Sequence, residues 1–423
     1  MTLDISTSII LIIFVLGYLA IIFEFYIKVN KTAVGIALAG ICWMIFFINN
    51  GSNTTGSLLE LGGHLSDISQ IIFFLLGAMT LVELIDSHKG FNLVLKWVNT
   101  RSKKKLLILI SLITFFLSAI LDNLTTTILM LSILRKLIPC RKDRLALNCM
   151  VVIAANSGGA WTPIGDVTTT MLWINNYIST TAVMSAIFLP SIISMAIPLC
   201  IYMISAKGRY PELKIDFTNE QKEPGAKIVF VLGILALVSV PIIKWLTGVP
   251  PFIGMLSALA LLWFVTDIIH YKYEDRQHLR IPFILTKVDV SSVLFFLGIL
   301  LSIDALESVG FLKYLAVWLG ETLSSPVIIA TFIGILSAII DNVPLVAAAM
   351  GMYDISVFPM NSHFWLLIAF TAGTGGSILS IGSAAGVALM GIEKVDFITY
   401  FKKAAFPAFL GYAGGIAIYL LIN

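Results

Sequence analysis

Two aspartate–asparagine pairs, at 122–123 and 341–342, each follow a long apolar run and lie 219 positions apart. A carboxylate placed in the hydrocarbon of a membrane costs about 2.5–3.5 kcal/mol on the insertion scale, which indicates that it serves a function there. Hydroxyl-bearing Thr125 follows the first pair, and Pro344, which cannot donate a backbone hydrogen bond, follows the second. We therefore expect a helix to break at each pair, with polar groups gathered at the break.

The likeness between the two halves of the chain extends beyond these pairs. Residues 67–77 resemble 289–298, and residues 157–165 resemble 374–382. The three pairs of segments keep their order, with offsets of 222, 219 and 217 positions, as expected for a duplicated unit. Glycine-interrupted apolar segments at matching positions in two halves indicate the substrate site of a transporter.

The composition excludes a soluble globular protein. Of the 423 residues, 58% are hydrophobic and only 12% are charged, and the mean hydropathy is +0.98. Because lipid leaves the backbone few alternatives, we predict an all-α polytopic membrane protein. The four cysteines show no metal-ligand spacing, and no HExxH, GxSxG or nucleotide motif occurs. We therefore expect neither an enzyme nor a cofactor, and residues 8–27 do not resemble a cleaved signal peptide.

We predict ten spans and two re-entrant hairpins, which enter the membrane and return to the same side. The continuous spans are expected at 8–27, 32–49, 67–87, 181–206, 226–246, 251–270, 288–308 and 396–422. Glycine-rich runs interrupt two further spans, the broken helices at 146–178 and 363–392. The hairpins are expected at 105–138 and 325–350, and interfacial helices at 91–103 and 311–323.

Charge favours the hairpin over a single crossing at 105–138. With that hairpin, 25 of the 27 lysines and arginines fall on one side, and only Lys244 and Lys313 lie opposite. The rich side is then cytoplasmic, and both termini lie outside. Length agrees, because helices over 105–121 and 125–138 would measure about 26 and 21 Å, against a hydrocarbon core of about 30 Å. The second hairpin is assigned by symmetry.

Each half then holds five spans and one hairpin, and because five is odd the halves are inverted relative to one another. The predicted first repeat covers 1–206, a cytoplasmic linker covers 207–225 and the second repeat covers 226–423.

Four segments, 64–91, 121–127, 153–173 and 339–344, resemble the NhaD-type sodium/proton antiporters of the ion transporter superfamily. The resemblance extends from about Leu59 to the C-terminus. It implies two inverted repeats, each with a re-entrant hairpin and a broken helix, in a homodimer with an elevator-like transport domain. It also implies an inner or plasma membrane location, with the lipid bilayer, sodium and protons as partners and no nucleic acid.

The hairpin tips differ from those of the superfamily's dicarboxylate and citrate carriers, which carry Ser-Asn-Thr. Two aspartates here favour a cation, so we expect exchange of sodium, and also lithium, for protons. A carboxyl group buried in apolar surroundings has a raised pKa and can hold either a proton or a metal ion. The alternative is an anion carrier of the same superfamily, for arsenite efflux or sodium-coupled dicarboxylate transport.

Sodium prefers oxygen ligands, and the two hairpins and broken helices supply them. The charged ligands are expected to be Asp122, Asp166 and Asp341. The uncharged ion-binding residues are expected to be Asn123, Thr125, Thr126, Asn156, Ser157, Thr162, Thr168, Ser337, Asn342, Thr374, Ser377 and Ser380, with Ser383 nearby.

Structural roles compete with several of these assignments. The aspartates could simply cap helices, and the paired glycines at 158–159 and 375–376 could serve close helix packing alone. Glu83 and Asp304 could line the pathway or pair with interfacial lysines. His64 and His88 could sense pH, although an interfacial histidine often has no special role.

Overall fold

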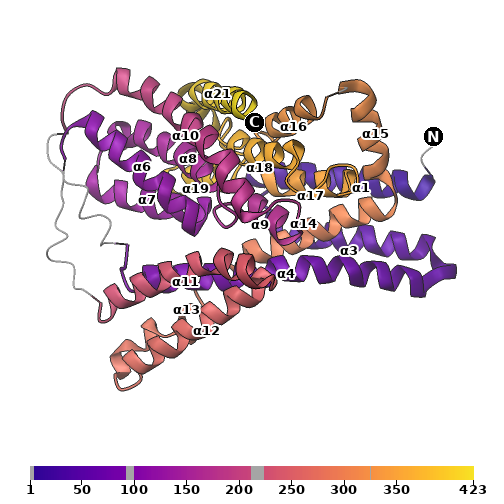
Figure 1. Ribbon diagram of the computed structural model, residues 1–423, viewed down its shortest axis with the longest axis horizontal. Helices are drawn as coiled ribbons and strands as arrows, with labels where there is room; N and C mark the ends of the chain where they lie inside the picture. Colours follow the sequence, from indigo (N-terminus) through magenta and orange to yellow (C-terminus); the bar gives the residue numbers. More distant parts are fainter. Residues whose placement is uncertain (1–3, 92–99, 211–222, 324) are drawn as a thin grey trace.

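The computed structural model describes residues 4–91, 100–210, 223–323 and 325–423 (Figure 1). Regular structure in these ranges is helical, apart from an isolated β-bridge between Ser102 and Arg209. Eight of the described helices are long and apolar enough to cross a membrane, or nine if the bent pair α15–α16 is counted as one span. The chain is therefore an all-α polytopic membrane protein.

The helices before the predicted linker are α1 (Ile5–Ile22), α2 (Glu24–Ile27), α3 (Lys31–Asn49), α4 (Thr54–Ser87), α6 (Lys103–Leu121), α7 (Asn123–Leu137), α8 (Arg141–Gly159), α9 (Val167–Ile174) and α10 (Thr180–Ser205). Those after it are α11 (Ala226–Thr247), α12 (Pro251–His270), α13 (Ile281–Ile284), α14 (Val290–Ser308), α15 (Phe311–Leu323), α16 (Pro326–Leu336), α17 (Asn342–Met352), α18 (His363–Gly375), α19 (Ala384–Glu393), α20 (Phe397–Tyr400) and α21 (Phe406–Ile422). Short 3-10 helices lie at Gly51–Asn53 and Glu274–Leu279, and a π-helical turn joins α20 to α21 at Phe401–Ala405.

Most predicted elements are present with shifted ends. The third predicted span starts at 67, whereas α4 begins at Thr54, where the Asn53 side chain accepts a hydrogen bond from the Gly56 amide. With no proline over 54–66, nothing ends the helix there. The expected helix at 311–323 is α15, whereas most of the one expected at 91–103, and most of the linker, lie outside the described residues.

Helix length does not decide whether the first Asp-Asn segment crosses or returns. The break at Asp122 is real, because α6 ends at Leu121 and α7 begins at Asn123. However, α6 has 19 residues and is itself long and apolar enough to cross a membrane. The re-entrant hairpins therefore stay predictions.

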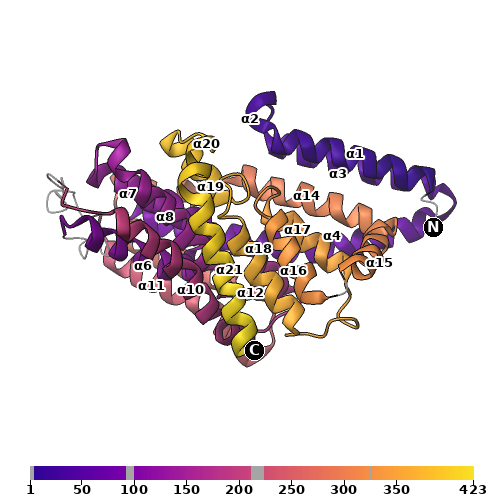
Figure 2. The same ribbon diagram turned by 90° about the horizontal axis from the view of Figure 1, so that it is seen from above.

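Two helices, α8 and α18, form the centre of the molecule (Figures 1 and 2). Every residue of α18 from Phe364 to Gly375 is buried, and α8 is buried continuously from Leu147 to Gly159. Helices with apolar and small residues on all sides are those packed inside a protein. On one edge of the molecule, α1 packs against α3 and α14 (Figure 2).

Corresponding helices in the two halves make corresponding contacts. Helix α6 packs on α8 as α16 packs on α18, and α3 packs on α14 as α12 packs on α4. The Ser118 hydroxyl donates to the Ala155 carbonyl at 2.6 Å, and the Ser337 hydroxyl donates to the Ala372 carbonyl at 2.7 Å. Each member of the second pair lies 217 or 219 positions after its counterpart, as the sequence offsets require.

The same correspondence holds for the closest helix approaches. A Cβ atom at Gly158 would lie 2.1 Å from the Phe115 carbonyl oxygen, and one at Gly375 would lie 1.9 Å from the Gly334 carbonyl oxygen. Since both neighbours are backbone atoms, no side-chain rotation could make room. Glycine is therefore required at both positions for helix packing.

Gly375→Ala is expected to destabilise the protein by about 3 kcal/mol, because one helix must move to relieve the clash. Thermal unfolding of the detergent-purified protein, followed by size-exclusion chromatography, measures the effect. Gly391→Ala in α19 is the matched control, since a Cβ there would meet no atom within 4 Å. That control should unfold at the wild-type temperature or above it. Equal stability of the two variants would contradict the packing described here.

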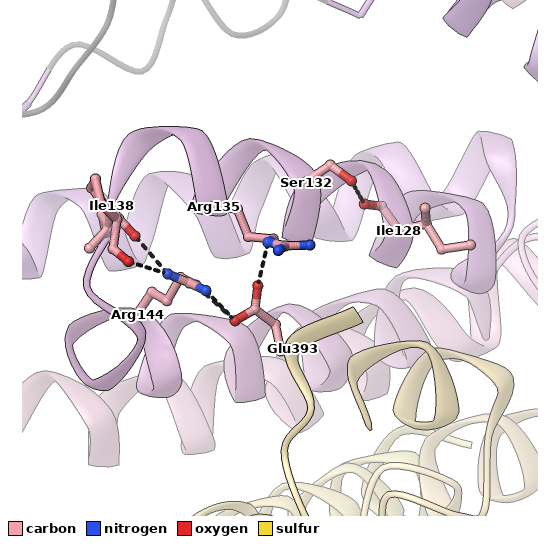
Figure 3. A network of polar contacts seen from close by, with 7 residues as sticks. Ile128, Ser132, Arg135, Ile138, Arg144 and Glu393 are labelled. Carbon is pink, nitrogen blue, oxygen red and sulfur yellow. Dashed lines mark hydrogen bonds and ion pairs between the residues drawn. The ribbon is translucent and has the colours of Figure 1, made fainter. Parts of the chain in front are cut away.

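A buried ion pair joins the ends of three helices (Figure 3). Glu393, the last residue of α19, accepts from Arg144 Nε at 2.8 Å, and Arg135 Nε of α7 lies 3.6 Å from its second oxygen. Arg144 also donates to the carbonyls of Ile138 and Pro139 at 3.0 and 2.7 Å. The turn between α7 and α8 is thereby attached to the end of α19.

Candidate ion-binding site

Asp166 lies where helices from both halves of the chain meet. It precedes α9, is 1% exposed, and its Oδ1 accepts from the Thr168 amide at 3.1 Å. Its Oδ2 accepts from Asn123 Nδ2, at the start of α7, at 2.7 Å. Asn342 Nδ2, at the start of α17, lies 3.3 Å from both carboxylate oxygens. The Asp166 carboxylate is therefore in contact with the residues that follow the helix breaks in both predicted hairpins.

Asn156 extends this network to the other broken helix. Its Oδ1 accepts from Asn123 Nδ2 at 3.1 Å, and its Nδ2 donates to the hydroxyls of Ser377 and Ser383 at 2.9 Å each. Together with Asp166 and Asn342, these form one buried polar centre, which we call the amide cluster: Asn123, Asn156, Asp166, Asn342, Ser377 and Ser383.

The other two predicted carboxylates lie beside the amide cluster, and both interact electrostatically with Asp166. Asp122 accepts from the Thr125 amide at 2.8 Å and from the Thr125 hydroxyl at 2.7 Å, so it also caps α7. Asp341 occupies the cap position of α17 but makes no side-chain capping hydrogen bond. Lys31 acts on its charge, and Tyr18 of α1, a residue that no motif in the sequence marks, also interacts with Asp341.

The remaining predicted ligands divide into two groups. The first group donates to backbone or to another serine: Thr162 to Ala119, Ser337 to Ala372, Thr374 to Phe370 and Ser157 to Ser194. The second group consists of Thr126 and Ser380, whose buried hydroxyls have no hydrogen-bond partner within the described ranges, and Thr168, whose side chain acts on the Asp166 carboxylate. Buried hydroxyls without partners are free to coordinate an ion.

A cavity of about 450 Å³ leads toward Asp122 from between α4 and α7. Thr125, which holds the Asp122 carboxylate, is one of its lining residues, and Glu83 and Asp86 line the opposite wall. In the other half, the corresponding helices α14 and α17 pack directly on one another. The cavity therefore lies on the α4–α7 side, next to the residue that holds Asp122.

Comparison with known proteins gives the family of the chain. The family model described as citrate transporter matches residues 18–373. Sodium/proton antiporter 1 of Arabidopsis thaliana is 51% identical over 97% of this chain and 72% of its own length, and sodium/proton antiporter 2 is 48% identical over 97% and 99%. The Na(+)/H(+) antiporter NhaD of Vibrio cholerae is 31% identical over 98% of this chain and 91% of its own length. The chain therefore belongs to the family of NhaD-type sodium/proton antiporters, within the group that the citrate transporter model describes.

Proposed function

We propose that this protein exchanges sodium for protons across a membrane, with the two ions competing for Asp166 and its neighbours Asp122 and Asp341. The observation that carries the proposal is the position of Asp166, a buried carboxylate held by amides from both halves of the chain. A buried carboxylate is costly unless a proton or a cation neutralises it. Carboxylate oxygens, with amide and hydroxyl oxygens as further ligands, suit sodium, and lithium as a smaller ion of the same charge.

An anion carrier is the second candidate, because the matching family model is described as citrate transporter. Helix N-termini attract anions, and α7, α9 and α17 all begin at the site. Each of these N-termini is preceded by an aspartate of the chain itself, at 122, 166 and 341. The amide cluster contains no lysine or arginine, and Lys31 is the one cation that acts on Asp341 among the described residues, so a carboxylate substrate would meet three aspartates against one lysine. Sodium/proton exchange is therefore the better supported function.

Proteoliposomes distinguish the two functions directly. With an imposed pH gradient, sodium and lithium should each be taken up as protons leave, and labelled citrate should not be taken up in the presence of sodium. Sodium-dependent citrate uptake without proton exchange would establish the alternative.

We further propose that the chain consists of two inverted repeats, each with a re-entrant hairpin, α6–α7 and α16–α17, and a broken helix, α8–α9 and α18–α19. The corresponding helix contacts and glycine approaches in the two halves support the duplication. The charge asymmetry supports the inversion. The homodimer, the elevator-like movement and the plasma-membrane location expected from the resemblance stay predictions.

The hairpin topology places the α7–α8 turn in the cytoplasm and the segment before α18 outside. Lys142 and Met360 are exposed and suit single cysteine substitutions in a background without the four native cysteines. We expect a membrane-impermeant thiol reagent, applied to whole cells, to label Met360→Cys and not Lys142→Cys. Permeabilised cells provide the control, since both cysteines should then react. Labelling of position 142 in intact cells would mean that 105–138 crosses once, and the inverted repeat would be wrong.

A further inference from the structure

The side-chain amides around Asp166 form a chain of hydrogen bonds. In this chain the orientation of one amide determines the orientation of the next. A carboxylate only accepts hydrogen bonds, so the Asn123 atom at 2.7 Å from Asp166 Oδ2 is its amide nitrogen. The same nitrogen lies 3.1 Å from the Asn156 side chain, which must therefore present its oxygen. The orientation of the Asn156 amide thus follows from the negative charge on Asp166.

The amide nitrogen of Asn156 then points toward the second broken helix. The hydroxyl oxygens of Ser377 and Ser383 each accept from it at 2.9 Å. The Ser383 oxygen also accepts from the Gly386 amide at 3.2 Å, which uses both of its lone pairs. Asn156, Ser377 and Ser383 are at most 2% exposed, so water does not replace either acceptor.

Ser383 occupies the position in the second repeat that Asp166 occupies in the first, 217 residues earlier, at the start of α9. A neutral hydroxyl stands where the first repeat has a carboxylate. The site therefore has one charged helix start, at α9, and one neutral helix start, at α19. The two are connected only through Asn156 and Asn123 in the described polar contacts.

We propose that Ser383 is a positioning residue for the sodium/proton exchange proposed above. With Ser377, it holds the nitrogen of Asn156 so that the oxygen of this amide faces the ion. When sodium reaches Asp166, the Asn123 nitrogen loses its acceptor and the amide turns its oxygen toward the cation. The Asn156 oxygen, held from behind by the two serines, becomes available as a further ligand.

The test measures the sodium concentration that half-saturates proton flux in proteoliposomes. Ser377→Ala and Ser383→Ala should each weaken apparent sodium affinity about five- to tenfold, the size expected for one hydrogen bond, at an unchanged maximal rate. Ser383→Thr keeps the hydroxyl and a good helix cap, so its affinity should stay within about twofold of wild type. Ser302→Ala is the matched control, because this buried hydroxyl of α14 bonds only to Gly298 of its own helix; its affinity should not change.

Ser383→Ala also removes a cap from α19, whereas the Ser377 side chain caps no helix, so Ser377→Ala separates positioning from folding. Wild-type sodium affinity in Ser377→Ala, or a reduced maximal rate with unchanged affinity in both alanine variants, would overturn the positioning role. Absence of sodium-dependent proton flux in the wild-type protein would instead overturn the exchange itself. The two failures are therefore distinguishable in one set of vesicles.

Discussion

Asp166→Asn is expected to abolish sodium/proton exchange in reconstituted vesicles. The substitution keeps the shape of the side chain, and asparagine caps a helix about as well as aspartate, so α9 should still form. The charge that binds the ion is lost. Hydrogen bonds to a charged group are worth about 1.5–3 kcal/mol, so losing one contact of that size to the ion predicts sodium binding weaker by about 10- to 160-fold.

Asp396→Asn is the matched control. Asp396 caps α20 by accepting from the Thr399 amide at 3.0 Å, it is exposed, and it lies outside the amide cluster. This variant should exchange sodium at the wild-type rate. Wild-type sodium-dependent proton flux through purified Asp166→Asn would show that the central carboxylate does not carry the ion.

Asp122→Asn and Asp341→Asn should also abolish or nearly abolish exchange, because each removes a negative charge that acts on Asp166. The structure nevertheless distinguishes their roles. Asp122 accepts two hydrogen bonds from Thr125, which a capping asparagine could partly keep. Asp341 makes no such capping bond, but Lys31 and the backbone amides of Asn342 and Val343 act on its charge.

The helix breaks at Asp122 and Asp341 could be found from the sequence because they occur twice, in the same order and spacing. Duplication distinguishes a functional carboxylate from an accidental one. The same comparison found the glycine pairs at 158–159 and 375–376, and the close approach of Gly158 and Gly375 to carbonyl oxygens gives the physical reason for them.

The central place of Asp166 could not be found in that way. Asn123 and Asn342, which hold it, lie 43 and 176 positions away, and no local periodicity reports such distances. The duplication is also uninformative here, because the second repeat has Ser383 at this position. The duplicated pairs favour Asp122 and Asp341, with Asp166 sharing their work, whereas the contacts place Asp166 at the centre and the other two beside it.

Helix ends show a related limit. The third span is predicted to start at 67, but Asn53 caps the helix and α4 begins at Thr54. Length and hydropathy describe whether a helix could cross a membrane, and α6 satisfies that description as well as seven of the eight predicted continuous spans do, all but the one at 8–27. The direction in which a helix leaves a break depends on what it packs against, in this case α8, and that contact is not local in sequence.

Apparent sodium affinity is expected to strengthen as pH rises, because sodium and protons compete for the same buried carboxylates. Burial disfavours the charged form of a carboxyl group, so at low pH the site holds a proton and sodium must displace it. Raising the pH removes this competitor. One competing proton changes the apparent affinity by at most about tenfold per pH unit, equivalent to about 1.4 kcal/mol, and two coupled protons would give a steeper change.

The measurement is the half-saturating sodium concentration in proteoliposomes over about three pH units. This concentration should fall with rising pH and then level off, once the pH is high enough for the sodium-free site to be deprotonated. Transport should be weak at acid pH and strong at alkaline pH. Ser302→Ala, outside the amide cluster, should give the same curve as wild type. An affinity that does not vary, with only the maximal rate changing, would show that pH acts elsewhere. The next groups to test would then be His88 and His270, which are buried and whose Nε2 atoms lie 3.0 Å apart. At that distance the two nitrogens can share one proton but cannot both carry one.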